Sequence, residues 1–244
     1  MRLRKLWSVL VFGAALAPGW AGASALALPP ASVTATINST TIDFSKMGSS
    51  LTDLQGVTTF MGSCSSTTTP TCMSWDFGWN FTAKPDPYID GNLMFTNTTS
   101  GTQTFDVVLT MPVSPGFSPG YESGKLSWTW KDNNDTTATL SNFAWYGQID
   151  GADAFSLATF GGTCGGSSIG CSGTGGPLSG GPTLVPTGVS TSIGMRFHFD
   201  LSAGDSASFT SRFEVTPVPL PAPLVLFASG LLGLTGLAAR RRRA

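Results

Sequence analysis

The chain has 244 residues and a formal net charge of −1, with 13 basic and 14 acidic side chains. Seven of the basic residues lie near the two ends, so the middle keeps six basic side chains against all 14 acidic ones, a net charge of about −8. This balance argues against nucleic-acid binding. It suits a soluble, secreted domain that repels other acidic surfaces.

The first 27 residues have the three regions of a secretory signal peptide. Three basic residues come first, and an apolar run over 6–16 follows. Small residues then allow signal peptidase to cleave after Ala25 or after Ala27, and both sites stay open. We therefore expect residues 1–27 to direct export.

Residues 28–216 are expected to form one secreted domain, because about 190 residues can build a single substantial core. The segment is rich in Thr, Ser, Gly, Phe and Trp and poor in Lys, Glu and Arg. Such a composition favours strands and turns over helices.

Alternating apolar and polar residues indicate strands throughout this segment. The clearest runs cover 75–82, 105–111, 126–130, 193–201 and 209–215. Weaker runs cover 33–37, 41–44, 56–60, 92–97, 137–146 and 154–160. One-sided alternation is typical of antiparallel sheets packed face to face. We predict an all-β fold, an antiparallel β-sandwich of about ten strands.

One stretch, residues 161–188, is rich in glycine and proline and has no aromatic residue. Its composition predicts a long, mobile loop between two strands.

The four cysteines form two closely spaced pairs, Cys64 with Cys72 and Cys164 with Cys171. In an exported protein this spacing predicts two local disulfides. Each would contribute ~2–3 kcal/mol by closing a short loop. Pairing between the two loops stays open, as does a zinc site, although the spacing is not that of a C-x-x-C motif.

Catalytic signatures are scarce. His198 is the one histidine, so a Ser-His-Asp triad would have to use it, and no G-x-S-x-G motif accompanies it. Glu122 and Glu214 are the only glutamates, and their spacing shows no carboxylate pair of the kind that a glycosidase needs. We predict no catalytic residues and no enzymatic activity.

Calcium is the one cofactor that the sequence suggests. Asp132 and Asp135 flank two asparagines, and the segment 150–153 carries two more aspartates. These side chains offer the oxygen ligands that Ca²⁺ prefers. The spacing is not that of an EF-hand, and the same residues are typical of simple turns. No other metal or cofactor is expected.

A sugar platform is a further hypothesis. Trp128 and Trp130 lie two residues apart on one strand face, with Tyr121 nearby. Exposed aromatic rings in this arrangement can stack on sugar rings, which would make the domain a carbohydrate-binding module. The same spacing is typical of a buried strand face, and that interpretation is favoured.

Residues 217–244 combine a proline-rich hinge, an apolar run over 224–239 and the basic tail Arg240, Arg241, Arg242 and Arg243. The apolar run has 16 residues and would measure about 24 Å as a helix. With its flanking residues it can cross a hydrocarbon core of about 30 Å. The arginines favour the cytoplasmic side, so everything before the helix is expected to face outward.

The start of this tail, Val218, Pro219, Leu220, Pro221 and Ala222, resembles the VPLPA variant of the PEP-CTERM sorting signal. The resemblance implies recognition by an exosortase, a membrane protease that removes the helix after the protein has been anchored in the inner membrane. It also implies a Gram-negative bacterium as the source. An uncleaved C-terminal anchor is the alternative.

Together these features predict a non-enzymatic exported protein of the cell surface or extracellular matrix, associated with exopolysaccharide or biofilm. Exosortase and signal peptidase are the expected processing partners. A carbohydrate-binding module is the main alternative function, and a secreted hydrolase is the third.

Overall fold

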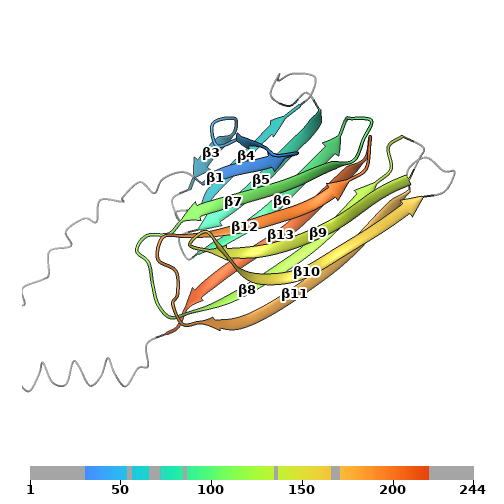
Figure 1. Ribbon diagram of the computed structural model, residues 1–244. Helices are drawn as coiled ribbons and strands as arrows, with labels where there is room; N and C mark the ends of the chain where they lie inside the picture. Colours follow the sequence, from blue (N-terminus) through green and yellow to red (C-terminus); the bar gives the residue numbers. More distant parts are fainter. Residues whose placement is uncertain are drawn as a thin grey trace, which may run out of the picture.

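The computed structural model describes residues 31–53, 57–65, 72, 74–84, 87–134, 137–165 and 171–219. Over these ranges the chain forms two antiparallel β-sheets packed face to face (Figure 1), so the predicted β-sandwich is confirmed. Nowhere in these ranges is there a helix long and apolar enough to cross a membrane. The predicted signal peptide and the predicted membrane helix, 224–239, lie outside them.

The first sheet has six strands in the order β10-β9-β12-β7-β1-β2. These are β1 (Ser32–Ile37), β2 (Thr40–Asp43), β7 (Gln103–Pro112), β9 (Thr137–Ile149), β10 (Ala152–Gly165) and β12 (Ser192–Leu201). We refer to it below as the six-stranded sheet.

The second sheet has seven strands in the order β11-β8-β13-β6-β5-β4-β3. These are β3 (Ser49–Thr52), β4 (Thr58–Cys64), β5 (Trp75–Lys84), β6 (Tyr88–Asn97), β8 (Gly120–Lys131), β11 (Ser172–Val185) and β13 (Ser206–Pro217). The described residues thus hold more strands than the ten or so predicted, because β3 and β11 lack clear apolar alternation and were not predicted.

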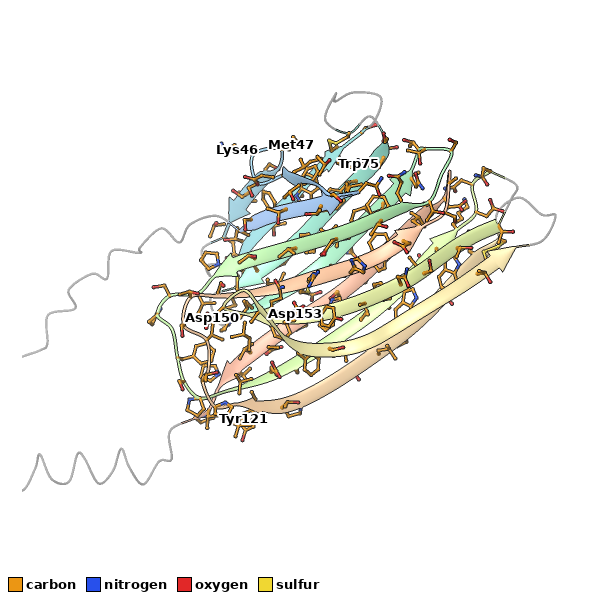
Figure 2. All side chains as sticks on the ribbon, in the orientation of Figure 1. Lys46, Met47, Trp75, Tyr121, Asp150 and Asp153 are labelled. Carbon is orange, nitrogen blue, oxygen red and sulfur yellow. A yellow bond between two sulfur atoms is a disulfide. The ribbon has the colours of Figure 1, made fainter. Side chains whose placement is uncertain are left out.

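The core lies between the sheets and is dominated by aromatic rings, which fill the space between the two layers (Figure 2). Phe95 of β6 stacks on Phe77 of β5, with 4.6 Å between ring centroids. It also meets two rings of the six-stranded sheet, Phe105 at 5.3 Å and Phe199 at 5.1 Å. Strand alternation therefore places one aromatic network across both sheets.

Three inward-facing tryptophans of the seven-stranded sheet lie over glycines of the neighbouring strand. The register pairs Trp79 with Gly62, Trp130 with Gly173, and Trp128 with Gly175. In each pair a Cβ on the glycine would overlap the indole ring. Glycine is thus required at these positions, because the indole ring occupies the space that any other side chain there would need.

The prediction of a long loop over 161–188 is wrong. β10 extends to Gly165, and β11 covers half of the glycine-rich stretch as an edge strand beside β8. The ladder is interrupted at two Gly-Gly-Pro sequences, where Gly176 and Gly181 have φ of +79° and +86°. Bulges with glycine at positive φ are typical of edges, and they discourage pairing with another sheet.

Both predicted disulfides are confirmed, Cys64–Cys72 and Cys164–Cys171, each with 6.0 Å between Cα atoms. The first closes the connection between β4 and β5, and the second that between β10 and β11. Strand register places both connections at the same end of the sandwich, which we call the disulfide end.

The described chain begins and finishes at the opposite end, which we call the terminal end (Figure 1). Ser32 pairs with Thr110 near the end of β7, and Pro217 pairs with Gly120 at the start of β8. β8, for example, runs from Gly120 at the terminal end to Lys131 at the disulfide end.

Candidate functional site

The two tryptophans considered as a sugar platform are core residues. Trp128 is 4% exposed and Trp130 is 5% exposed, and both point between the sheets. Their ring faces are covered by the glycines of β11 and by core residues such as Phe143, 5.4 Å from Trp128. The platform hypothesis is corrected accordingly, since a ring buried in the core cannot stack on a sugar. Tyr121 is 39% exposed.

The sorting motif is described only at its start. Val218 and Pro219 follow β13, and the backbone N–H of Val218 donates a hydrogen bond to the carbonyl of Pro119 at 3.1 Å. Leu220, Pro221, Ala222 and the arginines 240–243 lie outside the described residues. The role of this motif stays a prediction.

The proposed calcium ligand Asp132 is buried at the disulfide end, beside the buried Asp205. Asp132 accepts a hydrogen bond from the backbone N–H of Asn134 at 3.0 Å, and Asp205 accepts one from the Ser202 hydroxyl. Burial, followed by the charge of Asp132, raises the pKa of Asp205.

Asp135 lies outside the described residues. In the described part of the chain, no group of three or more histidine, cysteine or acidic side chains could hold a metal ion. The calcium hypothesis therefore stays a prediction.

The second acidic turn has a structural role at Asp150. Its carboxylate accepts hydrogen bonds from the backbone N–H groups of Ser190, Thr191 and Ser192 at 2.7–3.1 Å. Partial burial by itself would raise the pKa of Asp150. The hydrogen bonds outweigh that effect and lower the pKa to about 2. The turn is thereby fixed to the start of β12.

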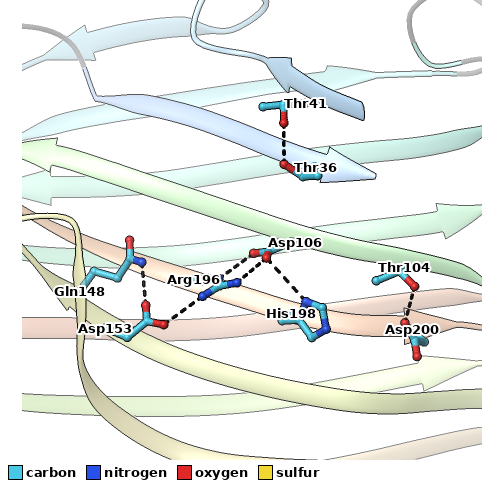
Figure 3. Close-up of polar contacts among 9 residues, drawn as sticks. All are labelled: Thr36, Thr41, Thr104, Asp106, Gln148, Asp153, Arg196, His198 and Asp200. Atoms are coloured by element: carbon cyan, nitrogen blue, oxygen red, sulfur yellow. Dashed lines mark hydrogen bonds and ion pairs between the residues drawn. The ribbon is translucent and has the colours of Figure 1, made fainter. Parts of the chain in front are cut away.

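His198 belongs to a charged network on the outer face of the six-stranded sheet (Figure 3). Arg196 donates two hydrogen bonds to Asp106, at 2.8 and 2.6 Å, and one to Asp153 at 3.0 Å. The hydrogen bonds to Asp106 are the main reason that the pKa of Arg196 is raised. Gln148 donates to Asp153 at 2.7 Å.

The Nδ1 atom of His198 lies 3.7 Å from Oδ2 of Asp106, an oxygen already bonded to Arg196. Among the described residues, no hydrogen bond joins His198 to a serine. A triad would need a serine on one imidazole nitrogen and an available carboxylate on the other. The network instead ties β7, β10 and β12 together.

Glu122 is the one acidic residue of β8 and points into the core at 5% exposure. Its Oε2 is buried and has no hydrogen-bond partner among the described residues. Burial raises the pKa of Glu122 above its ordinary value of 4.5. The folded state therefore binds this proton more tightly than the unfolded state does.

Glu122→Gln is expected to raise the free energy of unfolding at pH 7, by on the order of 1 kcal/mol, because it removes a buried, unpartnered charge. The native protein should lose stability as pH rises from about 4.5 through the raised pKa, where the unfolded state ionises first. Urea unfolding of both proteins across this window measures the effect. A difference that stays constant with pH would contradict it.

The outer face of the seven-stranded sheet is hollowed by two open depressions. One, the polar trough, has a volume of about 330 Å³ and is lined by Asn80, Thr82, Tyr88, Asp90, Gly91, Asn92 and Arg212. The other, the methionine depression, has about 650 Å³ and is lined by Met47, Gly48, Ser49, Met61, Gly62, Ser63, Trp79 and Asn80. Asn80 belongs to both, so the two adjoin.

Arg212 of β13 organises the polar trough. Its guanidinium lies 4.5 Å from the centroid of the Tyr88 ring. It donates to Glu214 at 2.7 Å and lies 3.7 Å from the Asp90 carboxylate. Three charged side chains and a phenol are thus held in fixed positions, because stacking and ion pairing restrict the long arginine side chain.

Asn92 and Asn80 supply amide groups at the centre of the face. Both are exposed, and they are direct register partners on β6 and β5. Asn92 accepts a hydrogen bond from the Thr210 hydroxyl at 2.6 Å, and its side chain makes no other hydrogen bond with the described residues. Its NH₂ group can therefore donate to a ligand.

The trough offers closely spaced donors and acceptors on a rigid sheet. Amide, carboxylate, phenol and hydroxyl groups together can bind neighbouring hydroxyl groups of one ligand, each as donor or acceptor. Such an arrangement suits a hydroxyl-rich molecule bound at the surface. It supplies neither a metal centre nor an activated nucleophile among the described residues.

This site is not visible in the sequence alone. The outward positions of β5 are visible as the polar half of an alternating strand, but Tyr88, Asp90 and Arg212 come from strands whose order the sequence does not reveal. The one available signal is the density of amides and hydroxyls at alternate positions of 76–82 and 88–96.

Comparisons with known proteins give little more. No protein-family profile matches the chain, and no curated protein matches it. Among solved structures, the carbohydrate-binding module TmCBM61 in complex with β-1,4-galactotriose is similar at 12% sequence identity and a TM-score of 0.23. The match covers 52% of this chain and 71% of that one. A likeness at this level says nothing about what the present chain binds.

Proposed function

We propose that this chain is a non-enzymatic exported protein of the cell surface or extracellular matrix that binds polysaccharide through the outer face of its seven-stranded sheet. The observation that carries the proposal is the polar trough, an open depression where amide, phenol, carboxylate and guanidinium groups converge on one rigid surface. Such groups match the hydroxyl pairs of a polysaccharide.

Export and sorting rest on the sequence. The signal peptide, the VPLPA motif and the basic tail support anchoring in the inner membrane, exosortase processing and release toward exopolysaccharide or biofilm. The two disulfides suit an oxidising compartment. Mass spectrometry of the exported protein tests this part, and an intact arginine tail in a strain with an exosortase would count against it.

Tyr88→Ala is expected to weaken binding to exopolysaccharide from the producing strain at least tenfold, about 1.4 kcal/mol. The change removes the phenol and the ring on which Arg212 rests. Affinity electrophoresis in gels containing the polysaccharide measures the effect.

The matched control is Tyr146→Ala, which removes a tyrosine from the outer face of the six-stranded sheet. It should leave binding within about twofold of the native protein. Equal losses in both variants, or unchanged binding in Tyr88→Ala, would contradict the proposed site.

A further inference from the structure

From the distribution of charge on the same face, we infer that the polysaccharide is neutral and that an internal segment of it lies across the strands. This inference rests on the proposed function and adds the class of ligand and its direction. It follows from the rows of side chains that strand register aligns across β4, β5, β6 and β13.

Two neighbouring rows on this face contain no ionisable side chain. The first joins Met61, Asn80, Asn92 and Thr210, and the second joins Ser63, Gly78, Met94 and Ser208. We call these two rows the uncharged band. On β8 the band continues with two more hydroxyl residues, Ser127 and Thr129. A strip without charge on an acidic protein suits an uncharged ligand, because ligand binding there displaces no bound counterions.

The band crosses four strands, so it measures about 14 Å at a strand spacing of about 4.8 Å. The polar trough borders the band and shares Asn80 and Asn92 with it, and the methionine depression shares Met61, Ser63 and Asn80. The two depressions join at Asn80 and are open to solvent. A terminal sugar would be held by a closed pocket, whereas an open, continuous surface accepts a chain that extends beyond both ends. The geometry therefore favours an internal segment of several sugar units.

Apolar contact is available along the band as well. Met61 is 45% exposed and Met94 is 59% exposed, on either side of the central amides. Methionine is flexible and polarisable, so it can adapt to the C–H faces of a sugar ring. The amides and hydroxyls between the methionines can bind the hydroxyl groups at the edge of the same ring.

Charges border the band but leave little for an anionic ligand. The guanidinium of Arg212 is shared by Glu214 and Asp90, so these three side chains have a net charge of −1. Beyond them Lys125 pairs in register with Arg212, and on the other side of the band Asp76 and Lys131 occupy the next row. A uronic-acid polymer would therefore meet carboxylates as well as cations along its path.

The inference is tested first by filling the band. No atom lies within 4 Å of where a Cβ on Gly78 would be, and Gly78 faces outward, so Gly78→Trp directs an indole onto the surface of the band. Gly101→Trp is the matched control, because the turn between β6 and β7 offers the same open space. We expect Gly78→Trp to weaken binding of the producing strain's exopolysaccharide at least tenfold, and Gly101→Trp to change it less than about twofold.

The second measurement uses the unchanged full chain, so it does not depend on any variant folding. Calorimetry is done with neutral gluco-, galacto-, manno- and xylo-oligosaccharides of increasing length, and with oligogalacturonates and oligomannuronates. We expect a neutral series to bind, with affinity rising roughly tenfold from the disaccharide to the tetrasaccharide. Tighter binding of a uronate series, or affinity that is the same at every length, would overturn the inference and leave the proposed function standing.

Two other outcomes separate the proposals. If the exopolysaccharide binds and Gly78→Trp has no effect, the path across the band is wrong although the protein binds polysaccharide. If neither the exopolysaccharide nor any oligosaccharide binds the native chain, the proposed function itself fails.

Discussion

Phe95→Ala is expected to lower the free energy of unfolding by about 3–5 kcal/mol, the range found when a buried phenylalanine is truncated. Phe95 is fully buried and contacts Phe77 within its own sheet and Phe105 and Phe199 in the other. Its removal leaves a cavity where the two sheets meet, and rings held by β-strands cannot collapse into it. For a domain of this size the melting temperature should fall by ~6–20 °C.

Met94→Ala is the control for this prediction, since Met94 is the preceding residue on the same strand but faces solvent. Its effect on unfolding should stay within about 0.5 kcal/mol. Chemical denaturation followed by tryptophan fluorescence measures both variants. A loss below about 1 kcal/mol for Phe95→Ala would mean that the aromatic network does not stabilise the packing of the sheets.

Gly173→Val is expected to destabilise the protein by about 1–3 kcal/mol, because the new side chain would overlap the indole of Trp130. The sign of this change in the free energy of unfolding is informative. Valine has a higher strand propensity than glycine, so in a strand without such a contact the same change would be neutral or stabilising by up to ~1 kcal/mol. Only an indole lying over the glycine reverses this expectation.

Gly78→Val supplies that comparison. Gly78 lies in β5 of the same sheet, faces outward, and has no atom within 4 Å of where a Cβ would be. Urea unfolding should therefore show opposite or clearly unequal effects for the two valine variants. Equal stability of Gly173→Val and Gly78→Val would show that the indole does not occupy the space above Gly173.

Alternation predicted the central strands well because each of them buries one face and exposes the other. In β5, for example, the aromatic residues Trp75, Phe77, Trp79 and Phe81 are buried, while Asp76, Gly78, Asn80 and Thr82 point outward. The cysteine pairing was predicted for a similar local reason, since each pair closes a short loop.

β11 could not be predicted from its own residues. Gly173 and Gly175 face inward, and the apolar groups that cover them belong to Trp130 and Trp128 on β8. The apolar groups over this part of the edge strand are therefore provided by the neighbouring strand, β8, and not by its own side chains. A pattern of Gly-x-Gly opposite Trp-x-Trp is a usable signal once the pairing of the strands is known.

The candidate site was hidden for a related reason. Asn80, Asn92 and Thr210 form one row, yet Thr210 lies more than a hundred residues after Asn92 along the chain. Each residue alone is an ordinary outward-facing polar position. Only the strand order brings them together, and that order depends on packing between the sheets.

The described chain begins and finishes at one end of the sandwich, which has a consequence for the proposed anchoring at a cell surface. If a C-terminal membrane segment anchors the chain, as proposed, the terminal end faces the bilayer and the disulfide-closed connections lie farthest from it. A polymer bound crosswise to the strands would then lie parallel to the membrane plane. Neighbouring anchored copies, side by side, would then be able to bind the same polymer chain.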